Sequence, residues 1–196
     1  MKLAVMQPYF FPYLGYFQLF HAADKVILYD NVKFIKSGWI HRNRILEIGK
    51  GPRFIGLPLE KASTNNRIKD VKIDVTKDWK TPIMHMLRHN YCRSPYYCEV
   101  KDIVDAALDL KEASISGLAK SSINAVLAYL DISTPVDYDS TRFDSLENDL
   151  DSLAFLPSST APFHRLKQKR MTYRVKALCD AENANTYINP IGGISS

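Results

Sequence analysis

The sequence has few cysteines, no long hydrophobic run and no low-complexity segment. Its three cysteines, Cys92, Cys98 and Cys179, are too few and too irregularly spaced for a disulfide framework, which favours a reducing compartment. No stretch approaches the roughly 20 apolar residues of a membrane span, so we expect no membrane insertion. Gln7 and Pro8 break the early apolar run, which argues against a signal peptide. We therefore expect a cytoplasmic protein.

The composition is that of an ordinary globular chain. Of its 196 residues, 46% are hydrophobic and 24% are charged. This balance excludes a collagen-like or wholly disordered protein, because there is enough apolar surface to offset the chain entropy lost on folding. The length suffices to bury a core without metal or disulfide bonds. We expect no structural metal.

The net charge of +5 is unevenly distributed. Residues 33–53 and 165–176 are strongly basic, whereas residues 131–151 are strongly acidic. Basic patches attract nucleic acid, anionic membranes or phosphorylated small molecules, and they can also be simple solvated faces. Transfer RNA binding to the basic 165–176 helix is one alternative, but the neighbouring acidic stretch disfavours it. A small phosphorylated molecule is the partner we expect.

The N-terminal pattern predicts a βαβ unit. Apolar runs at residues 2–6 and 25–29 predict strands, and the spacing of aromatic residues at 13–23 predicts a helix between them. The fold class we predict is α/β, with a Rossmann-like (nucleotidyltransferase-like) parallel sheet and a helical second half. In such sheets the site lies beyond the carboxyl ends of the strands, which places residues 7–12 and 30–34 at one rim.

The rest of the chain predicts further strands, helices and a linker. Strands are expected at residues 53–59, 68–75 and near Tyr187, and helices at 79–90, 114–130 and 167–184. Asp78 is expected to cap the first of these helices, and the acidic stretch 131–151 is expected to be a loop. The expected domain division is an α/β domain at 1–135, an acidic linker at 136–162, and a basic helix with a closing strand at 163–196 that returns to the same domain.

The loop after the first strand is the densest candidate site. Its prolines fix a sharp turn, and Gly15 permits close approach to the start of a helix, which favours anions. Nucleotidyltransferases of this fold carry H-x-G-H here, where this chain has Tyr13-Leu14-Gly15-Tyr16. The missing histidines count against nucleotidyl transfer, because a tyrosine carries no positive charge at neutral pH. The candidate residues are catalytic Tyr13 and Tyr16, and substrate-binding Gln7, Pro8, Tyr9 and Gly15. The alternative is an aromatic turn that only fills the core.

A second polar cluster begins where the second strand ends. Arginines there suit the bidentate recognition of phosphate, and His41 is the one side chain of the cluster whose ordinary pKa suits a general base. The candidate residues are catalytic His41 and substrate-binding Asp30, Asn31, Lys33, Lys36, Trp39, Arg42, Asn43 and Arg44. A solvated strand edge is the alternative. His85 and His89 share a helical face, but the glutamate of a zinc-binding H-E-x-x-H motif is absent.

Three sequence blocks together resemble the WbqC-like family of bacterial proteins. They are Q-P-Y-F-F-P-Y-L-G-Y-F-Q-L, Y-D-N-V-K-F-I-K-S-G-W-I-H-R-N-R-I and the C-terminal Y-I-N-P-I-G-G. Asp78-Trp79 and Ser94-Pro95-Tyr96-Tyr97 fit the same pattern. The last block adds Asn189, Gly192 and Gly193 to the expected binding residues. The resemblance implies a role in the biosynthesis of O-antigen, the outer part of lipopolysaccharide, or of other surface polysaccharides.

These observations favour a transferase that acts on a nucleotide-activated amino or deoxy sugar. The group transferred would be acyl or aminoacyl, with the amine of the sugar as nucleophile. The expected ligand is a nucleotide or nucleotide-sugar. The main alternative is a non-catalytic binding or scaffold protein of the same pathway. The sequence leaves the donor, the acceptor and the oligomeric state open.

Overall fold

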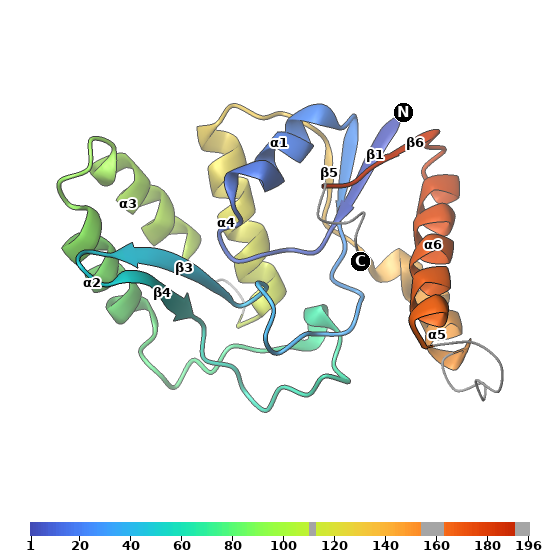
Figure 1. Ribbon diagram of the computed structural model, residues 1–196, viewed down its shortest axis with the longest axis horizontal. Coiled ribbons are helices and arrows are strands. Elements are labelled where there is room, and N and C mark those ends of the chain that lie inside the picture. Colours follow the sequence, from blue (N-terminus) through green and yellow to red (C-terminus); the bar gives the residue numbers. More distant parts are fainter. Residues whose placement is uncertain (110–112, 154–162, 191–196) are drawn as a thin grey trace. The chain divides into compact units, whose positions relative to one another are not determined.

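The structure, a computed structural model, describes residues 1–109, 113–153 and 163–190 (Figure 1). The chain forms two compact units, each built from segments that are not consecutive in the sequence. Unit 1 consists of Met1–Met6, Leu14–Asn31 and Thr134–Ser196, and unit 2 consists of Gln7–Tyr13 and Val32–Ser133. Unit 2 therefore consists of two insertions into the sequence of unit 1, one at residues 7–13 and a long one at residues 32–133.

Unit 1 is built on a parallel four-stranded sheet. Its strands are β1 (Lys2–Met6), β2 (Lys25–Leu28), β5 (Val136–Asp137) and β6 (Thr186–Ile188). Their spatial order is β5-β2-β1-β6, and every neighbouring pair is parallel. In chain order this reads third, second, first, fourth, which is the order of a Rossmann fold. The predicted fold class is confirmed, including the βαβ unit at the N-terminus.

Unit 1 contains three α-helices among its described residues. They are α1 (Leu14–Ala22), α5 (Asp144–Leu153) and α6 (Phe163–Ala181). In α1, the side chains of Tyr16, Phe17 and Phe20 are buried together, with ring centroids 5.4–6.3 Å apart. The helices predicted at 13–23 and 167–184 are thus present, and α6 begins a few residues earlier than expected.

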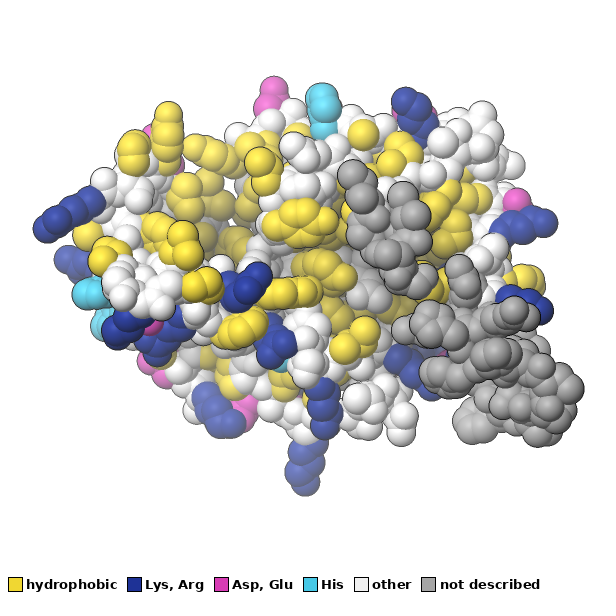
Figure 2. Space-filling view, viewed as in Figure 1, with side chains coloured by type: hydrophobic (Ala, Val, Ile, Leu, Met, Phe, Trp, Pro, Cys, Tyr) yellow, Lys and Arg dark blue, Asp and Glu magenta, His cyan; other side chains and the backbone are white. Residues whose placement is uncertain are grey.

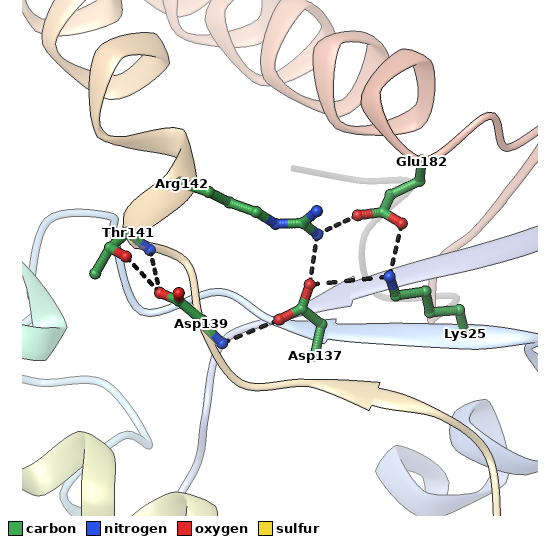
Figure 3. A network of polar contacts seen from close by, with 6 residues as sticks. All are labelled: Lys25, Asp137, Asp139, Thr141, Arg142 and Glu182. Atoms are coloured by element: carbon green, nitrogen blue, oxygen red, sulfur yellow. Dashed lines mark hydrogen bonds and ion pairs between the residues drawn. The ribbon is translucent and has the colours of Figure 1, made fainter.

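An ionic network ties the outer strand β5 to the rest of unit 1 (Figure 3). Lys25 on β2 contacts Glu182 at 2.7 Å and Asp137 on β5 at 3.9 Å. Arg142 contacts both carboxylates, and it lies in the short 3-10 helix Thr141–Phe143. Burial alone would raise the pKa of Glu182, but hydrogen bonds from Lys25 and Arg142 and their positive charges outweigh it and hold the pKa below its usual range.

The described residues of unit 2 form a β-hairpin, three α-helices and a short 3-10 helix. The hairpin pairs β3 (Arg42–Glu47) with β4 (Gly51–Gly56), and the helices are α2 (Lys80–Tyr91), α3 (Tyr97–Ala107) and α4 (Ile115–Tyr129). Gly49 and Gly51 take positive φ angles of 74° and 89°, which the tight hairpin connection requires. Trp79 is the N-cap residue of α2, and the carboxylate of Asp78, one residue earlier, accepts a hydrogen bond at 3.1 Å from the Thr81 N–H in the first turn. The central core side chains are Phe10, Phe34, Ile40, Ile55, Leu57, Ile68, Val71, Ile73 and Leu118.

Two secondary-structure predictions are wrong. Residues 68–75 do not form a strand: Ile68–Asp70 is a 3-10 helix, and the extended part that follows makes only isolated bridges, Leu59 with Ile73 and Lys72 with Ser114. The acidic stretch 131–151 is not a loop, because it holds β5, the 3-10 helix and most of α5. The strand predicted at 53–59 is present but is shifted to Gly51–Gly56.

No helix in the described part of the chain is both long enough and apolar enough to cross a membrane.

Candidate functional site

An open pocket in unit 2 brings together residues from both sequence clusters. Its volume is about 300 Å³, at the lower end of the range for small-molecule sites. Tyr13 is 60% exposed and Trp39 is 41% exposed, so aromatic faces are accessible to a ligand. We call this site the aromatic pocket; its lining residues are Tyr9, Pro12, Tyr13, Trp39, Asn43 and Arg44.

The loop that forms one wall of the aromatic pocket has a strained backbone. Phe11 has a φ angle of +45°, in the left-handed region that residues other than glycine seldom adopt. Hydrogen bonds hold the loop in this conformation: the Phe10 N–H donates to the Ile40 carbonyl at 3.1 Å, and the Phe11 N–H donates to Ser122 Oγ at 3.1 Å. Such strain costs about 1–3 kcal/mol and is concentrated at functional sites.

Asn43 attaches this loop to β3. Its Nδ2 donates to the Phe10 carbonyl at 3.0 Å and also to the Phe11 carbonyl. Its Oδ1 accepts from the Arg44 N–H at 2.7 Å. The carboxamide of Asn43 is therefore engaged by the protein itself, so that Asn43 positions the wall of the aromatic pocket.

Arg44 lies against two stacked aromatic rings at the edge of the aromatic pocket. The carbon at the centre of its guanidinium is 5.0 Å from the centroid of the Trp39 ring and 6.0 Å from that of Phe54. Phe54 stands directly opposite Arg44 in the hairpin register, and its ring stacks on Trp39. No carboxylate of the described residues pairs with Arg44. A guanidinium held over an aromatic ring can still donate from the N–H groups at its edge, so Arg44 can bind an anion.

Arg42, predicted to bind substrate, stabilises a turn of the chain. Its Nε donates to the Gly38 carbonyl at 3.1 Å and its guanidinium also donates to the Ser37 carbonyl. The guanidinium lies over the Phe54 ring, 4.8 Å from its centroid. Arg42 is not among the lining residues of the aromatic pocket, whereas Arg44 is.

His41, predicted as the general base, is not among the lining residues of the aromatic pocket. It is half-buried, and its ring centroid is 5.3 Å from that of Phe34. Its Nδ1 is buried and has no hydrogen-bond partner among the residues that the structure describes. Burial lowers the pKa of His41, and the positive charge of Arg42 lowers it further. The imidazole is therefore neutral at pH 7.

Tyr9 and Tyr13 supply hydroxyl groups at the aromatic pocket. Burial raises the pKa of Tyr9, and the neighbouring Tyr13 adds to the effect. The Tyr9 hydroxyl therefore remains protonated at neutral pH and can act as a hydrogen-bond donor. No carboxylate lines the aromatic pocket. With Arg44 present, the pocket favours an anionic ligand that also offers a flat or ring-shaped face.

Three other predicted residues are buried in unit 1. Tyr16 is fully buried in the aromatic cluster of α1. Asp30 accepts a hydrogen bond from Ser140 Oγ, and Asn31 Nδ2 donates to Asp144 at 2.8 Å and to the Ser140 carbonyl at 3.2 Å. These contacts attach the end of β2 to the segment that follows β5.

The remaining predicted residues do not line the aromatic pocket. Pro8 is buried, Gln7 and Gly15 are half-buried, and Lys36 and Asn189 are exposed. Lys33 forms an isolated antiparallel bridge with Arg67. Gly192 and Gly193 lie outside the described residues.

Sequence reasoning missed three residues that shape the aromatic pocket. Pro12 lines it, Phe54 stacks beneath Arg44 and Trp39, and Ser122 holds the strained loop. Phe54 lies in the strand predicted at 53–59. No strand was predicted at 42–47, so the sequence did not indicate that Phe54 would stand opposite Arg44. The signal for Ser122 was a small polar residue on the apolar face of the predicted 114–130 helix.

Within the described residues, no group of three or more His, Cys, Asp or Glu side chains is placed to hold a metal ion. Cys92, Cys98 and Cys179 are free thiols.

Comparison with known proteins identifies the family. The model of the WbqC-like protein family matches residues 7–196. An uncharacterized protein of Mycobacterium tuberculosis is 32% identical over 135 residues, which cover 68% of this chain and 58% of that protein. The chain thus spans less than two thirds of the length of this curated relative. No solved structure matches. Since the family match extends over nearly the whole sequence, the chain belongs to the WbqC-like protein family.

Proposed function

We propose that the aromatic pocket binds a nucleotide-activated amino or deoxy sugar and that the protein transfers a group to or from this sugar. The setting we propose is the cytoplasmic biosynthesis of a bacterial surface polysaccharide such as an O-antigen. The observation that carries the proposal is Arg44, whose guanidinium lies against Trp39 at the aromatic pocket without a carboxylate partner among the described residues.

Each part of the ligand has a matching surface. A diphosphate would accept hydrogen bonds from the edge of the Arg44 guanidinium. The exposed faces of Tyr13 and Trp39 suit a base or the apolar face of a sugar ring, because aromatic stacking tolerates many ring systems. The hydroxyl of the exposed Tyr13 can donate to a sugar or phosphate oxygen.

The proposal is tested by ligand binding measured through Trp39. The only other tryptophan is Trp79, so the Trp79→Phe variant makes the fluorescence specific to the aromatic pocket. We expect a panel of ATP, UDP, dTDP and their amino-sugar conjugates to contain a sugar nucleotide that changes this fluorescence and raises the melting temperature. A ligand at 100 times its Kd stabilises the folded state by about 2.7 kcal/mol.

The variant Arg44→Gln and its matched control Arg53→Gln complete the test. Arg44→Gln should weaken binding by about 2 kcal/mol, or some thirtyfold in Kd, because it removes a charged donor to phosphate. Arg53 lies on the same hairpin and is paired with Glu47 away from the aromatic pocket, so its variant should bind normally. Equal affinities of the two variants, or no response to any ligand, would overturn the proposal.

The transfer step we propose is acylation or aminoacylation of the sugar amine. The amine nitrogen forms a bond to the carbonyl carbon of an activated donor, the bond from that carbon to the leaving group breaks, and the leaving group takes its electron pair. The amine loses a proton to a general base. His41 is the proposed base, since its lowered pKa leaves the ring able to accept a proton at pH 7. Because His41 does not line the aromatic pocket, this role requires the sugar amine to reach past the lining residues.

His41→Asn tests the enzyme hypothesis. Loss of product with unchanged sugar-nucleotide binding would support His41 as the base, whereas full turnover would remove it from the mechanism. A non-catalytic binding role is the second candidate. It is favoured by the lining of the aromatic pocket, which contains no serine, cysteine, histidine or carboxylate. Tight binding without turnover of any donor would support that role.

A further inference from the structure

A second pocket in unit 2 is apolar throughout. Its volume is about 270 Å³, and no polar atom contributes to its surface. Ile45 of β3 forms one wall, Leu87 and Tyr91 of α2 form another, and Val100 and Val104 of α3 complete it. We call it the apolar pocket. It shares no lining residue with the aromatic pocket.

The mouth of the apolar pocket exposes hydrophobic side chains to solvent. Tyr96 is 64% exposed and Val100 is 44% exposed, although both line the pocket. Figure 2 shows hydrophobic side chains gathered over α3, with Lys and Arg side chains nearby. An exposed apolar recess is unfavourable in water unless something covers it.

Lys101 is the one cation among the described residues that line the apolar pocket. Its ammonium group pairs with the neighbouring Asp102, at 2.8 Å, and the negative charge of Asp105 also acts on it. Both side chains of that pair are largely exposed, so the pair is weak and can be exchanged for another anion. No carboxylate lines the apolar pocket.

We infer that the apolar pocket binds the alkyl chain of an anionic amphiphile, with the head group at Lys101. The wholly apolar wall favours a hydrocarbon chain. The aliphatic part of Lys101 extends from this wall to its ammonium group, so the pocket matches a ligand with an alkyl chain and an anionic head group at its end. A recess of this size accommodates one chain.

The chain-length dependence of binding tests this inference. Butanoate, hexanoate, octanoate, decanoate and dodecanoate are titrated below their micelle concentrations by calorimetry. The Kd should fall about fourfold for each added methylene until the apolar pocket is full, and should then stay level. A Kd that falls without a plateau would indicate adsorption to the surface and would overturn the inference. So would a Kd independent of chain length.

Two matched variants locate the site. Val100→Trp should block the mouth and abolish octanoate binding, whereas Val75→Trp, at an exposed valine outside the apolar pocket, should bind octanoate normally. Melting curves of the two variants identify any folding defect, and the fallback variant Val100→Ser should weaken binding with little effect on the fold. Equal binding by Val100→Trp and Val75→Trp would overturn the inference.

The head group is tested with Lys101→Gln. This variant should weaken octanoate binding two- to fivefold and leave octanol binding unchanged, because only octanoate carries the charge. An equal loss for both ligands would overturn the role of Lys101.

The source of the chain is tested by sedimentation with phosphatidylglycerol vesicles. Co-sedimentation that Val100→Trp abolishes would assign the chain to a membrane lipid, and its absence together with octanoate binding would assign it to a soluble amphiphile. A dimer that Val100→Trp dissociates in ligand-free buffer would instead show that a second copy covers the apolar pocket. Sugar-nucleotide binding at Trp39 is measured separately, so failure of one inference is distinguishable from failure of the other.

Discussion

Asn43 is the residue on which the geometry of the aromatic pocket depends most. Two hydrogen bonds from its Nδ2 join the strained Phe10–Phe11 segment to β3. A third bond runs from the Arg44 N–H to the Asn43 Oδ1. A residue in this position affects ligand binding without touching the ligand, because it fixes where Tyr9 and Tyr13 stand. Asparagine suits the task, since one side chain both donates and accepts.

We predict that Asn43→Asp destabilises unit 2 by about 1–3 kcal/mol. The Nδ2 group that donates to the Phe10 and Phe11 carbonyls is replaced by a carboxylate oxygen, which cannot donate a hydrogen bond. Urea unfolding followed by tryptophan fluorescence measures the change. The matched control is Asn65→Asp, at an exposed loop position of the same unit, which should unfold at the wild-type midpoint. Equal midpoints for the two variants would show that the Asn43 donor contributes nothing.

His41 gives the stability a dependence on pH. The pKa of the folded state lies below the ordinary value of 6.5, first because the ring is buried and then because of Arg42. As the pH falls through 6.5, the unfolded chain takes up a proton more readily than the folded one, so stability is complete above this pH and declines below it. Each unit of difference between the two pKa values corresponds to about 1.4 kcal/mol.

His41→Gln should therefore flatten the stability profile between pH 7.5 and 5. Unfolding free energies of the wild type and the variant at several pH values make the comparison. A wild-type profile as flat as that of the variant would mean that the folded protein accepts the proton on His41 without cost.

For single residues, the sequence predicted which side chains meet at the aromatic pocket but not which groups each of them contacts. Five predicted residues do meet at the aromatic pocket: Tyr9, Tyr13, Trp39, Asn43 and Arg44. Arg42 and Arg44 look alike in the sequence. They differ because the turn at Ser37 and Gly38 presents carbonyl groups to Arg42 alone. Backbone acceptors are set by the conformation of the chain, which residue spacing does not reveal.

Among the secondary-structure elements, α5 shows how a buried charge can conceal a helix. Phe143, Glu147 and Leu150 are buried at helical spacing, and Glu147 is only 2% exposed. The loop prediction rests on Pro135 and on the Ser and Asp residues of the acidic stretch, and a buried Glu147 interrupts the apolar pattern that would have indicated a helix. The carboxylate is tolerated there because Arg174 of α6 binds it with two nitrogens and the Tyr29 hydroxyl donates to it at 2.8 Å.

We predict that Glu147→Ala costs about 3–5 kcal/mol, because it leaves the Arg174 guanidinium in a largely buried site without its partner. The double variant with Glu147→Leu and Arg174→Met should lose less, since neither charge then remains. Chemical unfolding of both variants, with Asp149→Ala on the exposed face of α5 as control, measures the difference. A double variant less stable than Glu147→Ala would contradict this account.

The hairpin and the 68–75 segment show a second limit of pattern reading. Buried Ile68, Val71 and Ile73 follow a spacing of three and then of two, which a single strand template does not fit. Along the outer edge of β3, the Leu46 N–H donates to the Tyr91 hydroxyl and the Ile48 N–H donates to Asn90 Oδ1. Side chains, not a further strand, satisfy these edge groups, and such pairings arise only when α2 packs against the hairpin.

For the molecule as a whole, the division into two units has a direct experimental signature. The hydrophobic cluster around Phe34 and Ile73 belongs entirely to unit 2. Both tryptophans, Trp39 and Trp79, also lie in unit 2. Tryptophan fluorescence therefore follows unit 2 alone, whereas far-ultraviolet circular dichroism follows the helices of both units.

We predict that Glu147→Ala separates the two signals. In urea, the midpoint from circular dichroism should fall while the midpoint from fluorescence stays near that of the wild type, because the substitution lies in unit 1. A common midpoint for both probes would show that the units unfold as one.

The pairing of β1 with β6 also sets an order of events during synthesis of the chain. From Met6 to Ile188 the ribosome must add 182 residues, which takes about 10–40 s at typical rates. All the residues of the unit 2 cluster have been made once Leu118 has been added, long before β6 exists. The nascent chain thus carries an unpaired edge of β1 throughout this interval, and chaperones that shield exposed strands would act on the protein during that time.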